Sequence, residues 1–355
     1  MEDSSGAVLY GLVVSEFFSF LVILAAIPIK IFFYPEIDNQ AFTLALLTVP
    51  LISLLQNCRA ILQGMDFPLH ASLIETLVLP SGILLVLTAS YFLFDLKINL
   101  RLAFAASLIS SFVTCIIIIL LLVQKFPMAR IKWYSEIGEL RHVFHKSLPF
   151  CIGQSVFAIN SRVPLLILAA SASEIEGGAY YTSAMLASYV SFPLVTINPM
   201  ISGRAANLYA QSATSKLQLL FQRSAYLCFL LSAPFAGVLI IFGKSVLEIF
   251  NQLFVVGYPV LVILVIGQLF NTAAGSVGVL VNMTGNASVG TKVAAISTTI
   301  GICLCLMLIP SYGSEGAAIG QVTGLIVFNA LLVLFAIFRL GLNPSVIRSP
   351  CTCIR

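Results

Sequence analysis

Long apolar stretches separated by short polar segments make up most of this chain. An α-helix needs about 20 mostly apolar residues to cross the hydrocarbon core of a bilayer. Ten stretches approach or exceed that length, and each predicts a membrane-spanning helix. The predicted spans are 8–34, 41–63, 70–94, 102–124, 148–171, 178–203, 220–250, 256–283, 291–310 and 316–338.

The composition supports an all-α integral membrane protein. Hydrophobic residues make up 59% of the chain and charged residues 9%, whereas soluble domains are about half apolar and a quarter charged. The eight cysteines lie mostly in apolar runs and lack the spacing of a zinc site, so no metal is expected. The first residues are acidic, unlike a signal peptide, and the first span is expected to be retained.

Basic residues in the connections predict the orientation. They accumulate on the cytoplasmic side of membrane proteins. With residue 1 inside, twelve of the eighteen lysines and arginines fall on cytoplasmic segments, while the outer connections are short and acidic. Both termini are therefore expected in the cytoplasm.

The longest polar interruption divides the spans into four and six. Trp133, Ile137, Leu140 and Phe144 recur there at helical spacing among basic residues, which is typical of an amphipathic helix on a membrane surface. An ordinary positive-inside loop is the alternative. The expected organisation is an N-terminal bundle (1–124), a cytoplasmic amphipathic linker (125–147), a C-terminal bundle (148–340) and a cytoplasmic tail (341–355).

Arg162 is the most informative charge, because it lies near the middle of a predicted span. A charge at that depth is costly unless it faces a polar cavity. Its guanidinium suits bidentate binding of phosphate; a structural partnership with a buried acid or helix-end carbonyls is the alternative. Polar residues within spans add candidates for lining such a cavity, namely Gln154, Asn160, Asn198, Asn271 and Asn282.

Asn271 and Asn282 belong to a stripe of glycine and asparagine at intervals of three and four in span 256–283. Helix packing and cavity lining explain the stripe equally well. Toward the cytoplasmic side, Arg59 is a candidate for head-group entry, and Glu16 and Glu75 for protonation coupled to an H⁺ or Na⁺ gradient. Snorkelling to the interface is the alternative for these charges.

No enzyme is predicted. The outer connections are too short to present a catalytic domain, the three histidines form no ligand pattern, and no Walker-type phosphate loop occurs. No cofactor and no nucleic-acid partner are expected.

Several segments resemble a known family. They are 50–67 (PLISLLQNCRAILQGMDF), 147–170 (SLPFCIGQSVFAINSRVPLLILAA), 262–286 (VILVIGQLFNTAAGSVGVLVNMTGN) and 308–333 (LIPSYGSEGAAIGQVTGLIVFNALLV). They resemble oligosaccharide (O-antigen type) flippases of the multidrug/oligosaccharidyl-lipid/polysaccharide exporter superfamily.

The resemblance implies two six-helix lobes around a central cavity, and it aligns this chain from the family's third helix onward, with the first two helices lacking. It implies transfer of undecaprenyl-pyrophosphate-linked oligosaccharides across the bacterial inner membrane in polysaccharide and lipopolysaccharide biosynthesis. Membrane lipids and other polysaccharide-assembly membrane proteins are the implied partners. Pro164 stands where relatives often carry an aspartate, which leaves an ion-coupling role at that position unsupported.

Two alternatives to the flippase remain. A multidrug or metabolite exporter of the same superfamily is the first, although an apolar cavity with a buried acid would suit it better than Arg162 and amides. An inactive remnant is the second, motivated by the lacking helices.

Overall fold

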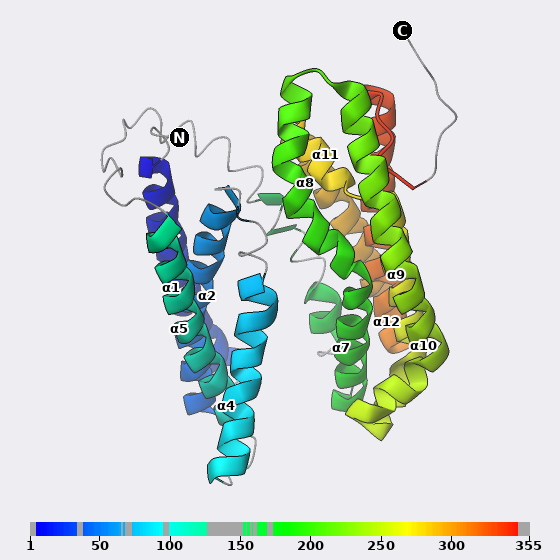
Figure 1. Cartoon of the computed structure of the whole chain (residues 1–355). Coiled ribbons are helices and arrows are strands. Elements are labelled where there is room, and N and C mark those ends of the chain that lie inside the picture. The colour runs from blue at the N-terminus through cyan, green and yellow to red at the C-terminus, as the bar shows by residue number, and fades with distance from the viewer. Residues whose placement is uncertain are drawn as a thin grey trace. The chain divides into compact units, whose positions relative to one another are not determined.

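The computed structural model describes residues 5–33, 38–64, 67, 73–94, 99–125, 152–153, 155–156, 158, 162–168 and 173–346. Regular structure in these ranges is entirely helical. The chain divides into two compact units, Met1–Phe144 and His145–Arg355 (Figure 1). The proposed amphipathic linker, apart from Lys125, and most of the proposed tail lie outside the described residues.

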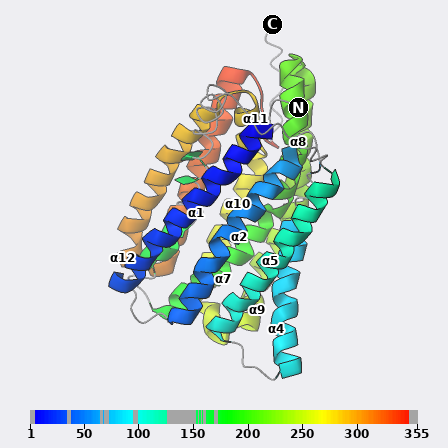
Figure 2. The same ribbon diagram turned by 90° about the vertical axis from the view of Figure 1, so that its left-hand side faces the viewer.

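The first unit is a row of long helices. Within it, α1 packs against α2, α2 against α5, and α5 against α4 (Figure 2). A π-helical turn, η1, leads directly into α4. The elements are α1 (Ser5–Phe33), α2 (Asn39–Gly64), η1 (Ile74–Val78), α4 (Leu79–Phe94) and α5 (Leu100–Lys125).

Small residues let α4 and α5 approach closely. A Cβ atom added at Gly82 would lie 2.4 Å from Ser110 Oγ. The Ser110 hydroxyl donates to the carbonyl of Leu79 at 2.8 Å. Small residues at such crossings are the usual basis of helix packing in membranes, where apolar burial does not drive helices together.

An ion pair joins the starts of α2 and α5. Arg101 Nε and Nη2 donate to the two carboxylate oxygens of Asp38 at 2.5 and 3.0 Å, and Asp38 also accepts from the amide of Ala41 at 3.1 Å. Asp38 thus caps α2 while it holds α5. The bonded guanidinium of Arg101 lowers the pKa of Asp38.

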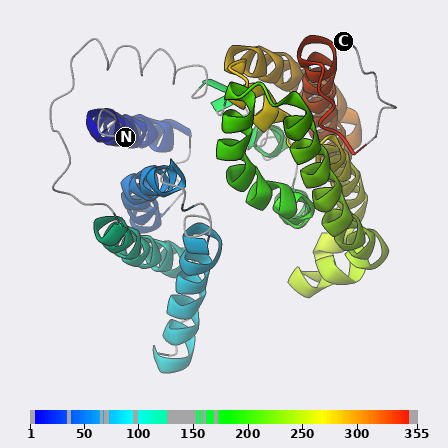
Figure 3. The ribbon, with the colours of Figure 1, turned by 45° about the horizontal axis from the view of Figure 1, so that its top comes forward.

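The second unit is built around α10, which packs against α7, α9 and α12. Helices α8 and α9 lie side by side (Figure 3). The elements after helical residues at 162–168 are α7 (Glu174–Ser188), η3 (Tyr189–Ser191), α8 (Phe192–Ala210), α9 (Thr214–Phe250), η4 (Gln252–Gly257), α10 (Tyr258–Ala274), α11 (Val277–Met283), α12 (Ala287–Phe335) and η5 (Ala336–Leu340).

Helix α12 is a hairpin of two arms that meet at Gly313, whose φ of 51° and ψ of −129° are non-helical. The arms return on each other, because Cβ atoms added at Gly316 and Gly320 would lie 2.5 Å from Leu308 O and 2.4 Å from Cys305 Sγ. The amide of Ser314, which begins the second arm, donates to Glu176 Oε1 at 2.7 Å. The arms correspond to the predicted spans 291–310 and 316–338.

The predicted span 256–283 is not one helix but two, α10 and α11. The chain breaks at Gly275, where φ is 73°. A Cβ atom there would lie 2.6 Å from the Cβ of Ala225 and 2.8 Å from the carbonyl oxygen of Pro344. Only glycine combines this backbone conformation with so close a neighbour. The released carbonyl of Ala273 accepts from the amide of Val346 at 3.0 Å.

Seven helical stretches in the described residues are long and apolar enough to cross a membrane, and the apolar helix Leu79–Leu93 is shorter. Large apolar side chains are widely exposed on them; Phe17 of α1 is 62% exposed and Ile249 of α9 82%. Side chains of this kind suit a bilayer rather than water. The protein is therefore a multi-pass membrane protein, and the α12 stretch accounts for two of the ten predicted spans.

Replacing Gly313 by alanine should destabilise the second unit by about 1–3 kcal/mol, because a positive φ strains any other residue and the new Cβ would lie 2.4 Å from Glu176 Oε1. Thermal unfolding of the purified protein in detergent measures the effect. Gly237→Ala in α9 is the matched control, since its Cβ meets nothing within 4 Å. Equal stability of the two variants would contradict the strained turn.

Candidate functional site

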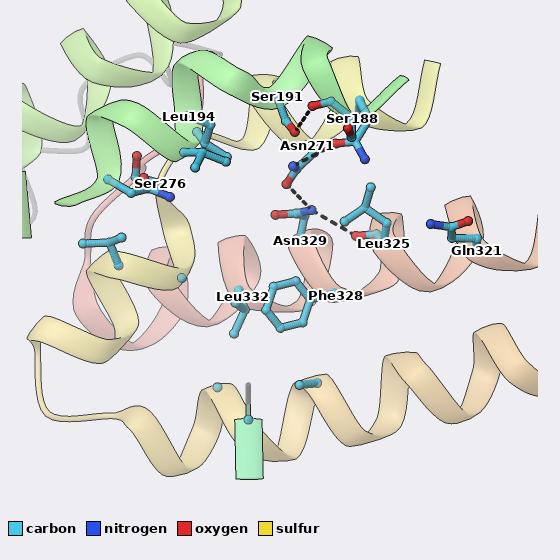
Figure 4. A pocket seen from close by; sticks show the side chains of 18 of the residues that line it. Ser188, Ser191, Leu194, Asn271, Ser276, Gln321, Leu325, Phe328, Asn329 and Leu332 are labelled. Atoms are coloured by element: carbon cyan, nitrogen blue, oxygen red, sulfur yellow. Dashed lines mark hydrogen bonds between the residues drawn. The ribbon is translucent and has the colours of Figure 1, made fainter. Parts of the chain in front are cut away.

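A cavity of about 660 Å³ lies within the second unit. Its walls come from the helical residues before α7, from α7 and α8, and from α10, α11 and α12 (Figure 4). The volume falls within the usual range of about 300–1,000 Å³ for small-molecule sites. The helices of one unit therefore enclose enough room for a substantial polar group.

The wall of the cavity is polar and carries one kind of charge. Among the described residues, Arg162 is the only charged side chain on it, and no carboxylate lines it. The Arg162 side chain is exposed. The other polar lining residues are the amides Asn198, Gln268, Asn271, Asn282, Gln321 and Asn329, and the hydroxyls Tyr180, Tyr181, Ser188, Ser191, Ser276 and Thr291.

Three of the amides form a chain of hydrogen bonds between α10 and α12. Asn329 Nδ2 donates to Asn271 Oδ1 at 3.0 Å and to the carbonyl of Leu325 at 3.0 Å. Asn271 Nδ2 then donates to Gln268 Oε1 at 3.3 Å. Asn329 is only 2% exposed. These bonds hold the amide groups in fixed directions on one wall of the cavity (Figure 4).

A second link crosses from α7 to α12. The Tyr180 hydroxyl donates to Gln321 Oε1 at 2.6 Å, and the Tyr180 ring is 2% exposed. Ser188 and Ser191 donate to backbone carbonyls of Met185 and Ser188 at 2.6 and 2.8 Å. The hydroxyl hydrogens of Ser188 and Ser191 are therefore used in hydrogen bonds within the protein.

Two buried side-chain oxygens of residues on the cavity wall have no hydrogen-bond partner in the described part of the chain. They are Asn198 Oδ1 on α8 and Ser276 Oγ at the break between α10 and α11. Buried polar atoms normally have partners. Among the described residues, the other such atoms are Glu16 Oε1, Gln63 Nε2 and Ser111 Oγ of the first unit, so within the described second unit both atoms belong to residues that line this cavity.

The structure brings four of the sequence-predicted site residues together: Arg162, Asn198, Asn271 and Asn282 all line the cavity. Their role in binding a substrate stays a prediction. Gln154 and Asn160 lie outside the described residues.

The remaining candidates belong to the first unit. Arg59 is half-buried in α2, where its Nη1 donates to Gln56 Oε1 at 3.2 Å. Glu16 is half-buried in α1, and Ser19 Oγ donates to its Oε2 at 3.3 Å. Glu75 lies in the π-helical turn η1, and its side chain is outside the described residues.

Sequence reasoning did not select Gln268, Ser276, Gln321 and Asn329, which the cavity includes. Gln268 lies three residues before Asn271, so helical spacing places both on one face. Asn329 is likewise a polar residue within a predicted span. The position of Ser276 on the cavity wall depends on the helix break, which arises from packing around Gly275 and has no local sequence pattern.

No protein-family model and no curated protein matches the sequence. Solved structures do match. An outward-facing multidrug resistance MATE family transporter of the MOP superfamily has a TM-score of 0.74 and 16% identity, over 95% of this chain and 78% of that one. A MOP superfamily transporter from Pyrococcus furiosus gives 0.75 and 16%, over 96% and 79%. A mutant of the Vibrio cholerae MATE transporter VcmN gives 0.72 and 17%, over 94% and 78%.

The chain has the MATE transporter fold. At 14–17% identity among the matched structures, the likeness concerns the fold alone. It agrees with the superfamily that the sequence resembles. The Pyrococcus furiosus protein is described as having a binding pocket of reverse polarity that suggests a different function. Lining chemistry is therefore a better guide to the substrate than the MATE fold itself.

Asn329→Leu should lower stability by about 0.6–2 kcal/mol, typical of hydrogen bonds between membrane helices, because Asn271 Oδ1 loses its donor. Thermal unfolding of Asn329→Leu, Asn271→Leu and the double variant measures the coupling. Thr323→Val on the same arm is the control, since its hydroxyl bonds only to Ile319 O of its own helix. Simple additivity in the double variant would contradict the link between the two asparagines.

Proposed function

We propose that this protein is a transporter that moves a lipid-linked oligosaccharide from the inner to the outer leaflet of the bacterial inner membrane. The MATE fold supports transport in general. The observation that carries the specific proposal is the cavity wall, where one arginine accompanies amides and hydroxyls and, among described residues, no carboxylate occurs.

A lipid-linked oligosaccharide needs such a wall. Its pyrophosphate and its hydroxyl groups lose their hydration in hydrocarbon unless the protein replaces it. Arg162 can offer a permanent charge and paired donors to phosphate oxygens. The amides of Asn271 and Asn329 can offer donors and acceptors to sugar hydroxyls.

A multidrug or metabolite exporter is the second candidate. The observation in its favour is the set of MATE transporters that share the fold. Apolar lining residues such as Leu194, Val195 and Phe328 would also suit an apolar compound. The positive charge on the cavity wall argues against a cationic drug, because Arg162 repels a cation and the described wall has no acid to attract one.

Transport of this kind needs an energy source, and we propose Glu16 as a coupling acid that exchanges H⁺ or Na⁺. The residue lies within the apolar helix α1, where an ionisable group marks a functional site by default. Its Oε1 is buried without a partner among the described residues.

The proposed orientation places both chain termini in the cytoplasm.

Proteoliposomes that contain a fluorescent undecaprenyl-pyrophosphate-linked oligosaccharide test the main proposal. The wild-type protein should accelerate flipping, and Arg162→Ala should slow it by about 10- to 100-fold, because charge-assisted hydrogen bonds to phosphate are lost. Arg162→Lys should retain part of the rate. Arg339→Ala, which removes the same charge outside the described cavity wall, should leave the rate unchanged.

The same vesicles separate the alternatives. Export of a cationic dye without flipping of the glycolipid would favour the multidrug exporter. Transport of neither compound would favour an inactive protein. Flipping that is equally fast with Arg162→Ala would reject the cavity as the phosphate path.

An imposed proton or sodium gradient tests the coupling acid. Flipping by the wild type should respond to one of the two gradients, whereas Glu16→Gln should flip at a rate that is independent of both. Ser5→Ala, near the start of the same helix, should respond as the wild type does. A full gradient response of Glu16→Gln would remove Glu16 from the mechanism.

A further inference from the structure

Two oxygen atoms on the cavity wall differ from the rest of its polar lining. Asn198 Oδ1 and Ser276 Oγ are buried and have no hydrogen-bond partner in the described residues. Ser276 as a whole is 2% exposed. Ser188 and Ser191, in the same cavity, bond to backbone carbonyls instead. A buried polar atom left unpaired destabilises the folded state, so each one calls for an explanation such as a bound water, ion or polar group of a ligand.

Tertiary packing fixes the position of Ser276. It follows Gly275, whose positive φ breaks the helix between α10 and α11. Ala225 and the Pro344 carbonyl pack against Gly275 so closely that a Cβ atom there would lie 2.6 and 2.8 Å from them. The Ser276 hydroxyl is therefore held at the cavity wall by the rigid scaffold around the break rather than by a mobile loop.

Asn198 and Ser276 share one end of the cavity. Ile197 and Val277, their chain neighbours, belong to the same apolar cluster, which also contains Leu332. Asn198 lies on α8, and Ser276 directly precedes α11; the two helices pack against each other.

Arg162 lies toward the other end. Leu165, one turn after Arg162, packs with Tyr180 in a second apolar cluster, and Tyr180 bonds to Gln321. Gln321 and Leu332 both lie on the second arm of α12, eleven residues apart, or about 16 Å along the helix. Ser276 and Gln321 accordingly appear on opposite sides of the cavity in Figure 4.

The two ends of the cavity suit ligand groups of opposite hydrogen-bonding character. Asn198 Oδ1 only accepts hydrogen bonds, so its partner must donate. An ionised pyrophosphate has only acceptors, which match the guanidinium of Arg162. Sugar hydroxyls and the N–H of an acetamido group are donors. With the ends exchanged, phosphate oxygens would face Asn198 Oδ1, which is also an acceptor.

We propose that Asn198 and Ser276 form a recognition subsite for the hydroxyl or amide donors of the substrate's sugar, while the anionic group lies at the Arg162 end. The subsite deepens the proposed function and rests on it. It makes these two side chains determinants of glycan specificity, and the substrate binds in a single direction along the cavity.

Two probes that differ only in the sugar test this proposal. Binding of undecaprenyl pyrophosphate and of undecaprenyl-pyrophosphoryl-N-acetylglucosamine is measured on the full chain in lipid nanodiscs. Ser276→Ala and Asn198→Leu should each weaken binding of the glycosylated probe by about three- to tenfold and leave the unglycosylated probe unchanged. Arg162→Ala should weaken both.

The control is Ser224→Ala. Ser224 is also buried, but its hydroxyl bonds to the Phe221 carbonyl in α9, so neither affinity should change. Thermal unfolding supplies a second readout, because Ser276→Ala removes an unpaired buried hydroxyl and should unfold at a higher temperature than the wild type. Ser276→Thr, which keeps the hydroxyl, should keep the sugar preference.

The outcomes separate the two proposals. If the wild type binds neither probe, the proposed function is rejected, and the proposed subsite is rejected as well. If the wild type prefers the glycosylated probe and both variants keep that preference, the subsite alone is overturned. Equal weakening of both probes by Asn198→Leu or Ser276→Ala would also overturn it, as a general packing defect.

Discussion

The hydrocarbon core of a membrane offers no hydrogen-bond partners, and this constraint governs the structure. Any backbone group released from a helix must find its partner inside the protein. At the end of α10 the carbonyl of Ala273 finds the amide of Val346. The break at Gly275, within a predicted span, is thus supported by a residue distant in sequence.

The same constraint orders the polar side chains. Asn329, Asn271 and Gln268 bond in series between α10 and α12, and Tyr180 bonds to Gln321 between α7 and α12. These bonds fix the wall of the cavity and connect its helices. Where a polar group in the wall has no partner among the described residues, as at Ser276, the proposed sugar would supply one. The polar side chains that connect the helices would therefore also form the wall that binds the proposed substrate.

Lining chemistry separates this protein's proposed substrate from the drugs exported by transporters of similar fold. The MATE fold supplies the helices, and in the proposed function the charge on the wall selects the substrate. Arg162 stands in the described lining without a carboxylate, which favours anionic or neutral polar molecules over cations. The arginine was visible in the sequence because a charge inside an apolar span is rare.

The helices themselves follow from the sequence, since the length of an apolar run sets whether it can cross the bilayer. Spans 8–34 and 102–124, for example, agree closely with α1 and α5. The residues Arg162, Asn198, Asn271 and Asn282 could be selected for the same reason: each is polar within an apolar run.

Only the tertiary structure decided how those residues meet and which others join them. The break at Gly275 is packed against Ala225 and Pro344, about 50 and 70 residues away, so no local pattern indicates that Ser276 lines the cavity. Likewise, Asn329 pairs with Asn271 across 58 positions. The apolar pattern of a segment indicates whether its helix can lie in the bilayer. The cavity, in contrast, forms through contacts between helices that are distant in sequence, and the pattern of one segment does not indicate these contacts.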